Sequence, residues 1–173
     1  MAAGVTFYYT GSGSSANPEL SLGGANSANV ISSVSLNNLF DNISAAEALA
    51  GGSTWGAGEG LDVRAIAIKN TGTLTLYNIK IWSPSTSSAT SSAYTWFTMA
   101  KDSGTQSVAD ESTLPSAPTL DFQLWADEND AITESFLNVG SYIRLWIKRK
   151  LTASAPAFSA DTKTIYIRAQ VTT

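Results

Sequence analysis

The sequence predicts an all-β fold: a single-domain antiparallel β-sandwich, immunoglobulin-like or jelly-roll-like, with one or two short helices and long loops. Short runs rich in β-branched and aromatic residues recur along the chain, separated by clusters of Gly, Pro, Asn and Ser. Only 14% of residues are charged, while 24 Ser and 19 Thr supply polar side chains that suit solvent-facing strand positions. A length of 173 residues fits one domain spanning 1–173.

The clearest strands lie in the middle of the chain. Residues 61–70 alternate between two faces at the strand period, and residues 73–82 do the same after a Thr71–Gly72 turn. This arrangement predicts a β-hairpin. The aromatic and apolar run at 93–100 predicts a further strand.

Two amphipathic runs predict the last strands. Residues 141–151 are expected to turn one apolar face to the core, made of Ile143, Leu145 and Ile147. The opposite face would carry Tyr142, Arg144, Trp146, Lys148 and Lys150. Residues 163–171 are expected to face inward with Ile165, Ile167, Ala169 and Val171, and outward with Tyr166, Arg168 and Gln170.

Loops and helices complete the predicted organisation. The small polar residues at 83–92 predict an exposed loop, and 101–119, which contains two prolines, predicts a second long connection. Ser44 and Glu47 form a capping box that predicts a short helix, closed by two glycines at 51–52. Residues 131–137, which follow an acidic cluster, are a weaker helical candidate.

The composition argues against an enzyme. The chain has no His and no Cys, so it lacks the side chains most used for proton transfer near neutral pH and for binding zinc or iron. We therefore expect no catalytic residues, no cofactor and no metal. A pair of carboxylates, as in glycosidases, is the remaining catalytic alternative. The Asp and Glu residues are instead assigned to helix starts and loops.

The sequence also argues against binding to dinucleotides, nucleic acids and membranes. Residues 11–16 match a dinucleotide-binding fingerprint in form, but Pro18 and the non-helical residues after it deny the helix that would hold the phosphates. A net charge of −4 and a pI near 4.6 oppose nucleic-acid binding. The chain has no apolar run long enough to cross a membrane, and its opening residues lack the features of a signal peptide.

Aromatic residues are the best candidates for contacts with a partner. Trp82, Trp96 and Trp146 fall within or at the end of strand-like runs and are expected in the core or on a sheet surface. Trp55 lies in a Gly-rich loop and is the leading candidate for an interface aromatic. Tyr8 and Tyr9 are further interface candidates, within residues 1–25, which could form an extended N-terminal arm.

Four sequence blocks carry a family resemblance. In order along the chain they are YYTGSGSSANPELSLGGANS (8–27), LFDNISAAEALAGGSTW (39–55), RAIAIKNTGTLTLYNIKIW (64–82) and RLWIKRKLTASAPAFSADTKTIYIRAQ (144–170). This ordered set resembles virion structural proteins of tailed bacteriophages. The shared motifs are packing and turn motifs, so the resemblance supplies no catalytic residue.

The resemblance implies a capsid decoration or cement protein that binds the outside of a phage capsid and stabilises it. The implied partners are the major capsid protein and copies of the same chain, arranged as a trimer, with no nucleic acid, membrane or small-molecule substrate. The implied location is the capsid surface of the virion, after assembly in the host cytoplasm. The alternative is a carbohydrate- or receptor-binding β-sandwich module of a tail fibre or adhesin, using exposed Trp and Tyr.

Overall fold

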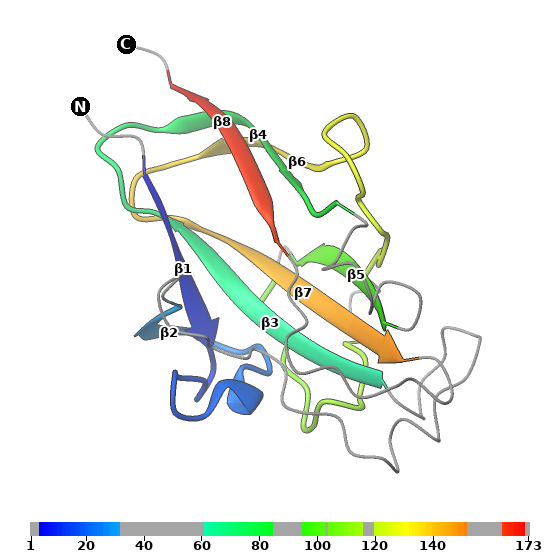
Figure 1. Ribbon diagram of the computed structural model, residues 1–173. Helices are drawn as coiled ribbons and strands as arrows, with labels where there is room; N and C mark the ends of the chain where they lie inside the picture. Colours follow the sequence, from blue (N-terminus) through cyan, green and yellow to red (C-terminus); the bar gives the residue numbers. More distant parts are fainter. Residues whose placement is uncertain are drawn as a thin grey trace.

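Two antiparallel β-sheets form the part of the chain that the structure describes (Figure 1). The structure is a computed structural model that describes residues 4–31, 61–84, 95–102, 104–115, 120–151 and 164–171. The five-stranded sheet has the order β2-β1-β3-β7-β5, and the three-stranded sheet has the order β6-β4-β8. The strands are β1 (Val5–Thr10), β2 (Asn26–Val30), β3 (Leu61–Asn70), β4 (Leu76–Trp82), β5 (Thr95–Asp102), β6 (Ile132–Leu137), β7 (Tyr142–Leu151) and β8 (Tyr166–Val171). The predicted all-β sandwich is confirmed.

The main core lies between the two sheets. Alternate residues of β3, β5 and β7 meet alternate residues of β4 and β6 there, with β8 packed against them. The buried residues of this cluster are Ile66, Ile68, Leu76, Ile79, Ile81, Met99, Ile132, Leu137, Ile143, Leu145 and Ile147. The predicted inward face of β7 is therefore confirmed. Of the predicted last strand, Ile165, just before β8, and Ile167 and Ala169 within it pack inward as predicted, whereas Val171 is exposed.

The predicted hairpin between 61–70 and 73–82 is wrong. Strands β3 and β4 belong to different sheets, so the chain between them crosses the sandwich instead of turning back within one sheet. The buried Asn70 side chain explains this path: its amide donates to the carbonyls of Leu74 (2.8 Å) and Leu137 (2.9 Å), and its oxygen accepts from the Gly72 N–H (3.0 Å). These bonds fix the crossing by tying the end of β3 to the chain that follows it and to the end of β6.

The second predicted helix is also wrong, because residues 132–137 form β6. Strand β6 pairs along its length with β4, from Ile81↔Ile132 to Leu76↔Leu137. The acidic cluster before it makes a turn: Asp127 Oδ1 accepts the N–H of Asn129 (2.7 Å) and of Asp130 (3.1 Å). The capping-box helix at 44–51 lies outside the described residues. Among those residues, the only helical element is the 3₁₀ turn η1 (Pro18–Leu20).

The expectation of an N-terminal arm is corrected for residues 4–25. Strand β1 pairs with both β2 and β3, from Val5↔Asn70 to Tyr9↔Ile66. The chain after β1 folds back on the sheet, where the buried Ser21 hydroxyl donates to the Ala65 carbonyl (2.6 Å). This segment is part of the domain because the sheet depends on its hydrogen bonds.

The outer face of the five-stranded sheet is covered over part of its area. Residues 104–115 of the predicted long connection, which we call the covering segment, lie against this face, whereas residues 101–102 belong to β5. Val108 and Leu114 of the covering segment, together with Leu120 and Phe122, pack around Val63, Ala65 and Trp146. Trp146 was predicted on the face opposite the core, and it is buried in this second cluster. Lys148 on the same face is buried too, with its Nζ 4.8 Å from the centre of the Phe122 ring.

Candidate functional site

The outer face of the three-stranded sheet exposes aromatic side chains from all three strands. Tyr77 of β4 is 38% exposed, Phe136 of β6 is 54% exposed and Tyr166 of β8 is 48% exposed. Tyr77 and Phe136 are directly paired across the two strands. At the other end of β4, Trp82 stacks on Tyr166 with ring centroids 5.6 Å apart and an interplanar angle of 15°. We call these four side chains the aromatic face.

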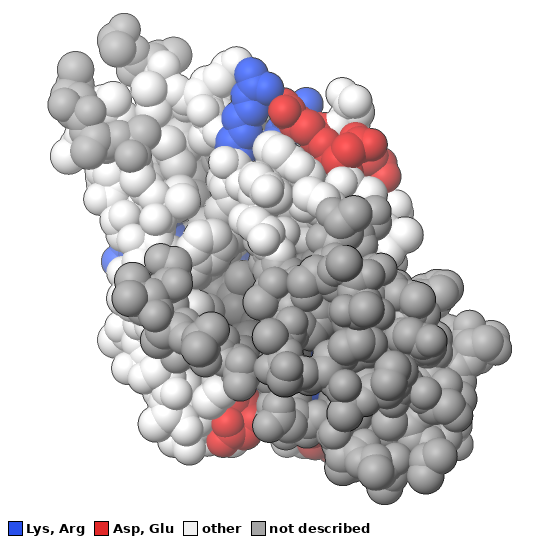
Figure 2. All heavy atoms as spheres, in the orientation of Figure 1, with Lys and Arg blue, Asp and Glu red and all other residues white. Residues whose placement is uncertain are grey.

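A cluster of three charged side chains lies over the same sheet face, between the two pairs of aromatic side chains. Glu128 forms ion pairs with Lys80 of β4 and Arg168 of β8, which are themselves cross-strand partners. Figure 2 shows basic and acidic atoms side by side over the end of the molecule where β4 and β8 lie, with uncharged surface around them. The aromatic face is therefore apolar at both ends and internally charge-paired at its centre.

A second surface lies on the opposite side of the sandwich, at the end of the five-stranded sheet that the covering segment leaves free. Tyr8 of β1 and Tyr142 of β7 meet edge to face, with ring centroids 5.9 Å apart. Lys69 of β3 places its Nζ 5.1 Å from the Tyr142 ring centre and 5.8 Å from that of Tyr8. A hydrogen bond to the Tyr142 side chain raises the pKa of Lys69 above its usual value. Lys69 is therefore fully charged at neutral pH.

Arg144 lies beside this cluster and is 6% exposed. Its guanidinium donates to the Asn26 side-chain oxygen (2.7 Å) and to the Gly104 carbonyl (3.4 Å), while its Nε has no hydrogen-bond partner among the described residues. Burial lowers the pKa of Arg144, and the charge of Asp102 partly opposes that shift. Together, Tyr8, Lys69, Tyr142, Arg144 and Asn26 are called the tyrosine–cation surface.

A cavity of about 320 Å³ adjoins the tyrosine–cation surface at the end of β5. It is lined by Asn26, Lys101, Asp102, Gly104, Thr105, Glu134, Tyr142, Ile143 and Arg144. Across it, Lys101 of the five-stranded sheet and Glu134 of the three-stranded sheet form an ion pair of 3.0 Å. The cavity is thus a polar notch at the open edge of the sandwich.

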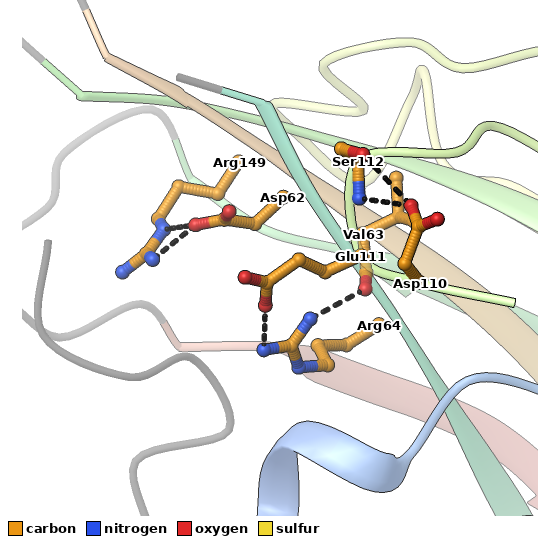
Figure 3. A network of polar contacts seen from close by, with 7 residues as sticks. All are labelled: Asp62, Val63, Arg64, Asp110, Glu111, Ser112 and Arg149. Carbon is orange, nitrogen blue, oxygen red and sulfur yellow. Dashed lines mark hydrogen bonds and ion pairs between the residues drawn. The ribbon is translucent and has the colours of Figure 1, made fainter. Parts of the chain in front are cut away.

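A buried charged layer continues the inner face of β3 away from the apolar core (Figure 3). Arg149 Nε donates to Asp62 Oδ2 at 2.8 Å, and both side chains are buried. Arg64 is fully buried and forms an ion pair with Glu111, and its guanidinium also donates to the Val63 carbonyl (3.0 Å). Asp110 beside it accepts from Ser112 and Thr113 and closes a turn. The Asp62–Arg149 pair joins β3 to β7, and the Arg64–Glu111 pair holds the segment after β5 to β3. We therefore assign both pairs a structural role.

The predicted interface residues have three different outcomes. Tyr8 is partly exposed and belongs to the tyrosine–cation surface. Tyr9 is fully buried with its hydroxyl unpartnered among the described residues, and burial raises its pKa, so its selection as a surface residue is corrected. The reason is strand alternation: Tyr9 shares the inward side of β1 with Val5 and Phe7. Trp55 lies outside the described residues.

Sequence reasoning did not select Lys69, Tyr142 or Phe136 as surface candidates. Tyr142 was placed on the correct face of its strand, and that alternation was the only signal that could have selected it. Phe136 was assigned to a helix, which hid its position on an exposed sheet face. Lys69 becomes a candidate only when β1 and β7 lie beside β3.

No protein-family model, curated protein or solved structure was found to match the chain. Among the described residues, His, Cys, Asp and Glu side chains form no group of three that could hold a metal ion. In the same part of the chain, no helix has the length and apolar character needed to cross a bilayer.

Proposed function

We propose that this protein is a structural virion protein that binds the outside of a bacteriophage capsid and stabilises it. The observation that carries the proposal is the aromatic face. Tyr, Trp and Phe are enriched at protein interfaces, where their large rigid rings bury much apolar area at a small entropic cost. The ordered sequence blocks that resemble tailed-phage virion proteins supply the identity of the partner.

The arrangement of the two surfaces supports a bridging role. The aromatic face and the tyrosine–cation surface lie on the outer faces of different sheets, so they point away from each other. A cement protein must contact at least two neighbouring subunits. Because it binds the assembled shell and not the separate subunits, its binding stabilises the shell by mass action. Copies of the chain arranged as a trimer around capsid symmetry axes would fit this role.

Rebinding to capsids tests the proposal. Purified capsids that lack the protein are mixed with wild-type protein, and bound protein is measured after sedimentation. We expect saturable, stoichiometric binding, which Phe136→Ser weakens by about tenfold or more because it removes an exposed interface aromatic. Val139→Ser is the matched control, since Val139 is 52% exposed but lies in the turn between β6 and β7. Failure of wild-type protein to bind would overturn the proposal.

The alternative function is a carbohydrate- or receptor-binding module of a tail fibre or adhesin. The observation that favours it is the Trp82–Tyr166 stack, which has one exposed ring beside the Glu128 carboxylate and the Arg168 guanidinium. Aromatic rings flanked by polar groups are a common setting for sugar binding. Saturable glycan binding that Tyr166→Ala abolishes, together with no binding to capsids, would favour this alternative.

A further inference from the structure

The tyrosine–cation surface carries two cations that lack a carboxylate in hydrogen-bond contact among the described residues. Lys69 has ring contacts but no ion pair within that part of the chain. Arg144 donates to two neutral oxygens and keeps its buried Nε unpartnered there. Because Arg144 is buried and Lys69 is only half-buried, Lys69 is the cation of the two that an outside group can reach.

The carboxylates near these cations are already engaged by other donors. Asp102 accepts the indole N–H of Trp146 (3.1 Å), the N–H of Gly104 (2.7 Å) and the side-chain amide of Gln106 (3.4 Å). Glu134 is paired with Lys101. The donors to Asp102 are neutral, so Asp102 keeps its negative charge and offsets part of the charge of Arg144, its partner across the strands. Among the described residues, the positive charge left for an external group is therefore that of Lys69.

The shape of the region favours a polypeptide over a small ion. Strand β5 ends opposite Arg144, at the pair Asp102↔Arg144, and the cavity begins at that point. The first residues of β7, Tyr142 and Ile143, line it. A chain segment passing along this notch would lay apolar and backbone atoms on the Tyr8 and Tyr142 rings while a carboxylate reaches Lys69.

We infer that the tyrosine–cation surface binds an acidic segment of a partner polypeptide through carboxylates held by Lys69 between the Tyr8 and Tyr142 rings. The inference rests on the proposed function, for which it supplies the second of the two contacts that bridging requires. It specifies the chemistry of that contact: Asp or Glu side chains, flanked by the two tyrosine rings. Affinity should therefore fall as ionic strength rises.

The test is a nuclear magnetic resonance titration of the full-length ¹⁵N-labelled protein with defined probes. A hexaglutamate peptide with blocked ends is compared with the matching hexaglutamine peptide and with sodium phosphate at equal ionic strength. We expect the hexaglutamate peptide to cause saturable shifts of the Asn26, Lys69, Tyr142 and Arg144 amides, with little effect from the hexaglutamine peptide. Lys69→Glu should weaken the binding by about tenfold, and Lys69→Arg should preserve it.

Arg168→Glu is the matched control, because it reverses an exposed charge on the opposite sheet and should leave the peptide affinity unchanged. Equal shifts with the hexaglutamine peptide, shifts with phosphate alone, or an unchanged affinity of Lys69→Glu would each overturn the inference. The spectrum of each variant also reports whether it is folded. Loss of peptide binding with intact capsid rebinding overturns only this inference, whereas loss of capsid rebinding overturns the proposed function.

Discussion

Single residues decide how closely the covering segment approaches the sheet. Gly23 has a positive φ of 85°, and a Cβ added there would lie 2.6 Å from Trp146 Cζ2 and would also collide with the Gln106 carbonyl. Gly140 has a similar φ of 80°, but a Cβ added there would meet no atom within 4 Å. A side chain at Gly140 would therefore meet only an unfavourable backbone conformation, whereas a side chain at Gly23 would also lack space.

Gly140→Ala should cost about 1–2 kcal/mol of unfolding free energy, because only the left-handed backbone is disfavoured. Gly23→Ala should cost about 1–3 kcal/mol more, because the new methyl group must displace Trp146 or the Gln106 backbone. Urea denaturation of both variants measures the difference. Equal losses would show that Gly23 is not packed against Trp146 and Gln106 as described.

Asn70 is a second residue whose side chain determines the path of the chain. Asn70→Ala should lower the unfolding free energy by about 2–4 kcal/mol, since it leaves buried carbonyls without donors. Asn138→Ala is the control: that side chain is exposed and accepts a hydrogen bond from Thr75, so we expect a loss below about 0.5 kcal/mol. Similar losses in the two variants would contradict the role given to Asn70.

At the scale of elements, strand period could be read from the sequence, while strand partners could not. The alternation in β3, β4, β5, β7 and β8 placed these strands within a few residues, because a buried face imposes a period of two. The partner of β4 depends on the Asn70 hydrogen bonds to Leu74 and Leu137, and the second of these is 67 residues away. The residues of the Thr71–Gly72 turn do not indicate which strand pairs with β4.

The error at β6 has a similar physical origin. Residues 131–137 have no strong periodicity, and the acidic residues before them suit a helix start and an Asp-closed turn equally well. Pairing with β4 decides the outcome, since it buries Ile132 and Leu137 in the core. The candidate surfaces were hidden for the same reason: Tyr8, Lys69 and Tyr142 come from three strands that only the tertiary fold brings together.

The covering segment is the element whose order depends most on one side chain. Trp146 fills the space beneath it and donates to Asp102, so Trp146→Ala should cost about 3–5 kcal/mol. The variant should also expose residues 104–115 to limited proteolysis, because the apolar cluster that holds them is lost. Mass spectrometry of the first cleavage products tests this, and cleavage confined to other regions would contradict it.

At the scale of the whole molecule, two sheets present two chemically different outer surfaces. One displays aromatic side chains around an internally paired ionic group. The other displays tyrosines with cations that, among the described residues, have no carboxylate in hydrogen-bond contact. A protein that bridges two subunits requires such a separation. A glycan-binding module needs only one of these surfaces.

Heat stability of the capsid tests the bridging claim most directly. Capsids lacking the protein are measured by scanning calorimetry alone, with wild-type protein, and with Phe136→Ser or Lys69→Glu at saturating concentration. We predict that wild-type protein raises the capsid melting temperature, and that each variant, altered on one face, raises it much less even when bound. Stoichiometric binding of wild-type protein without any rise in the melting temperature would contradict the account.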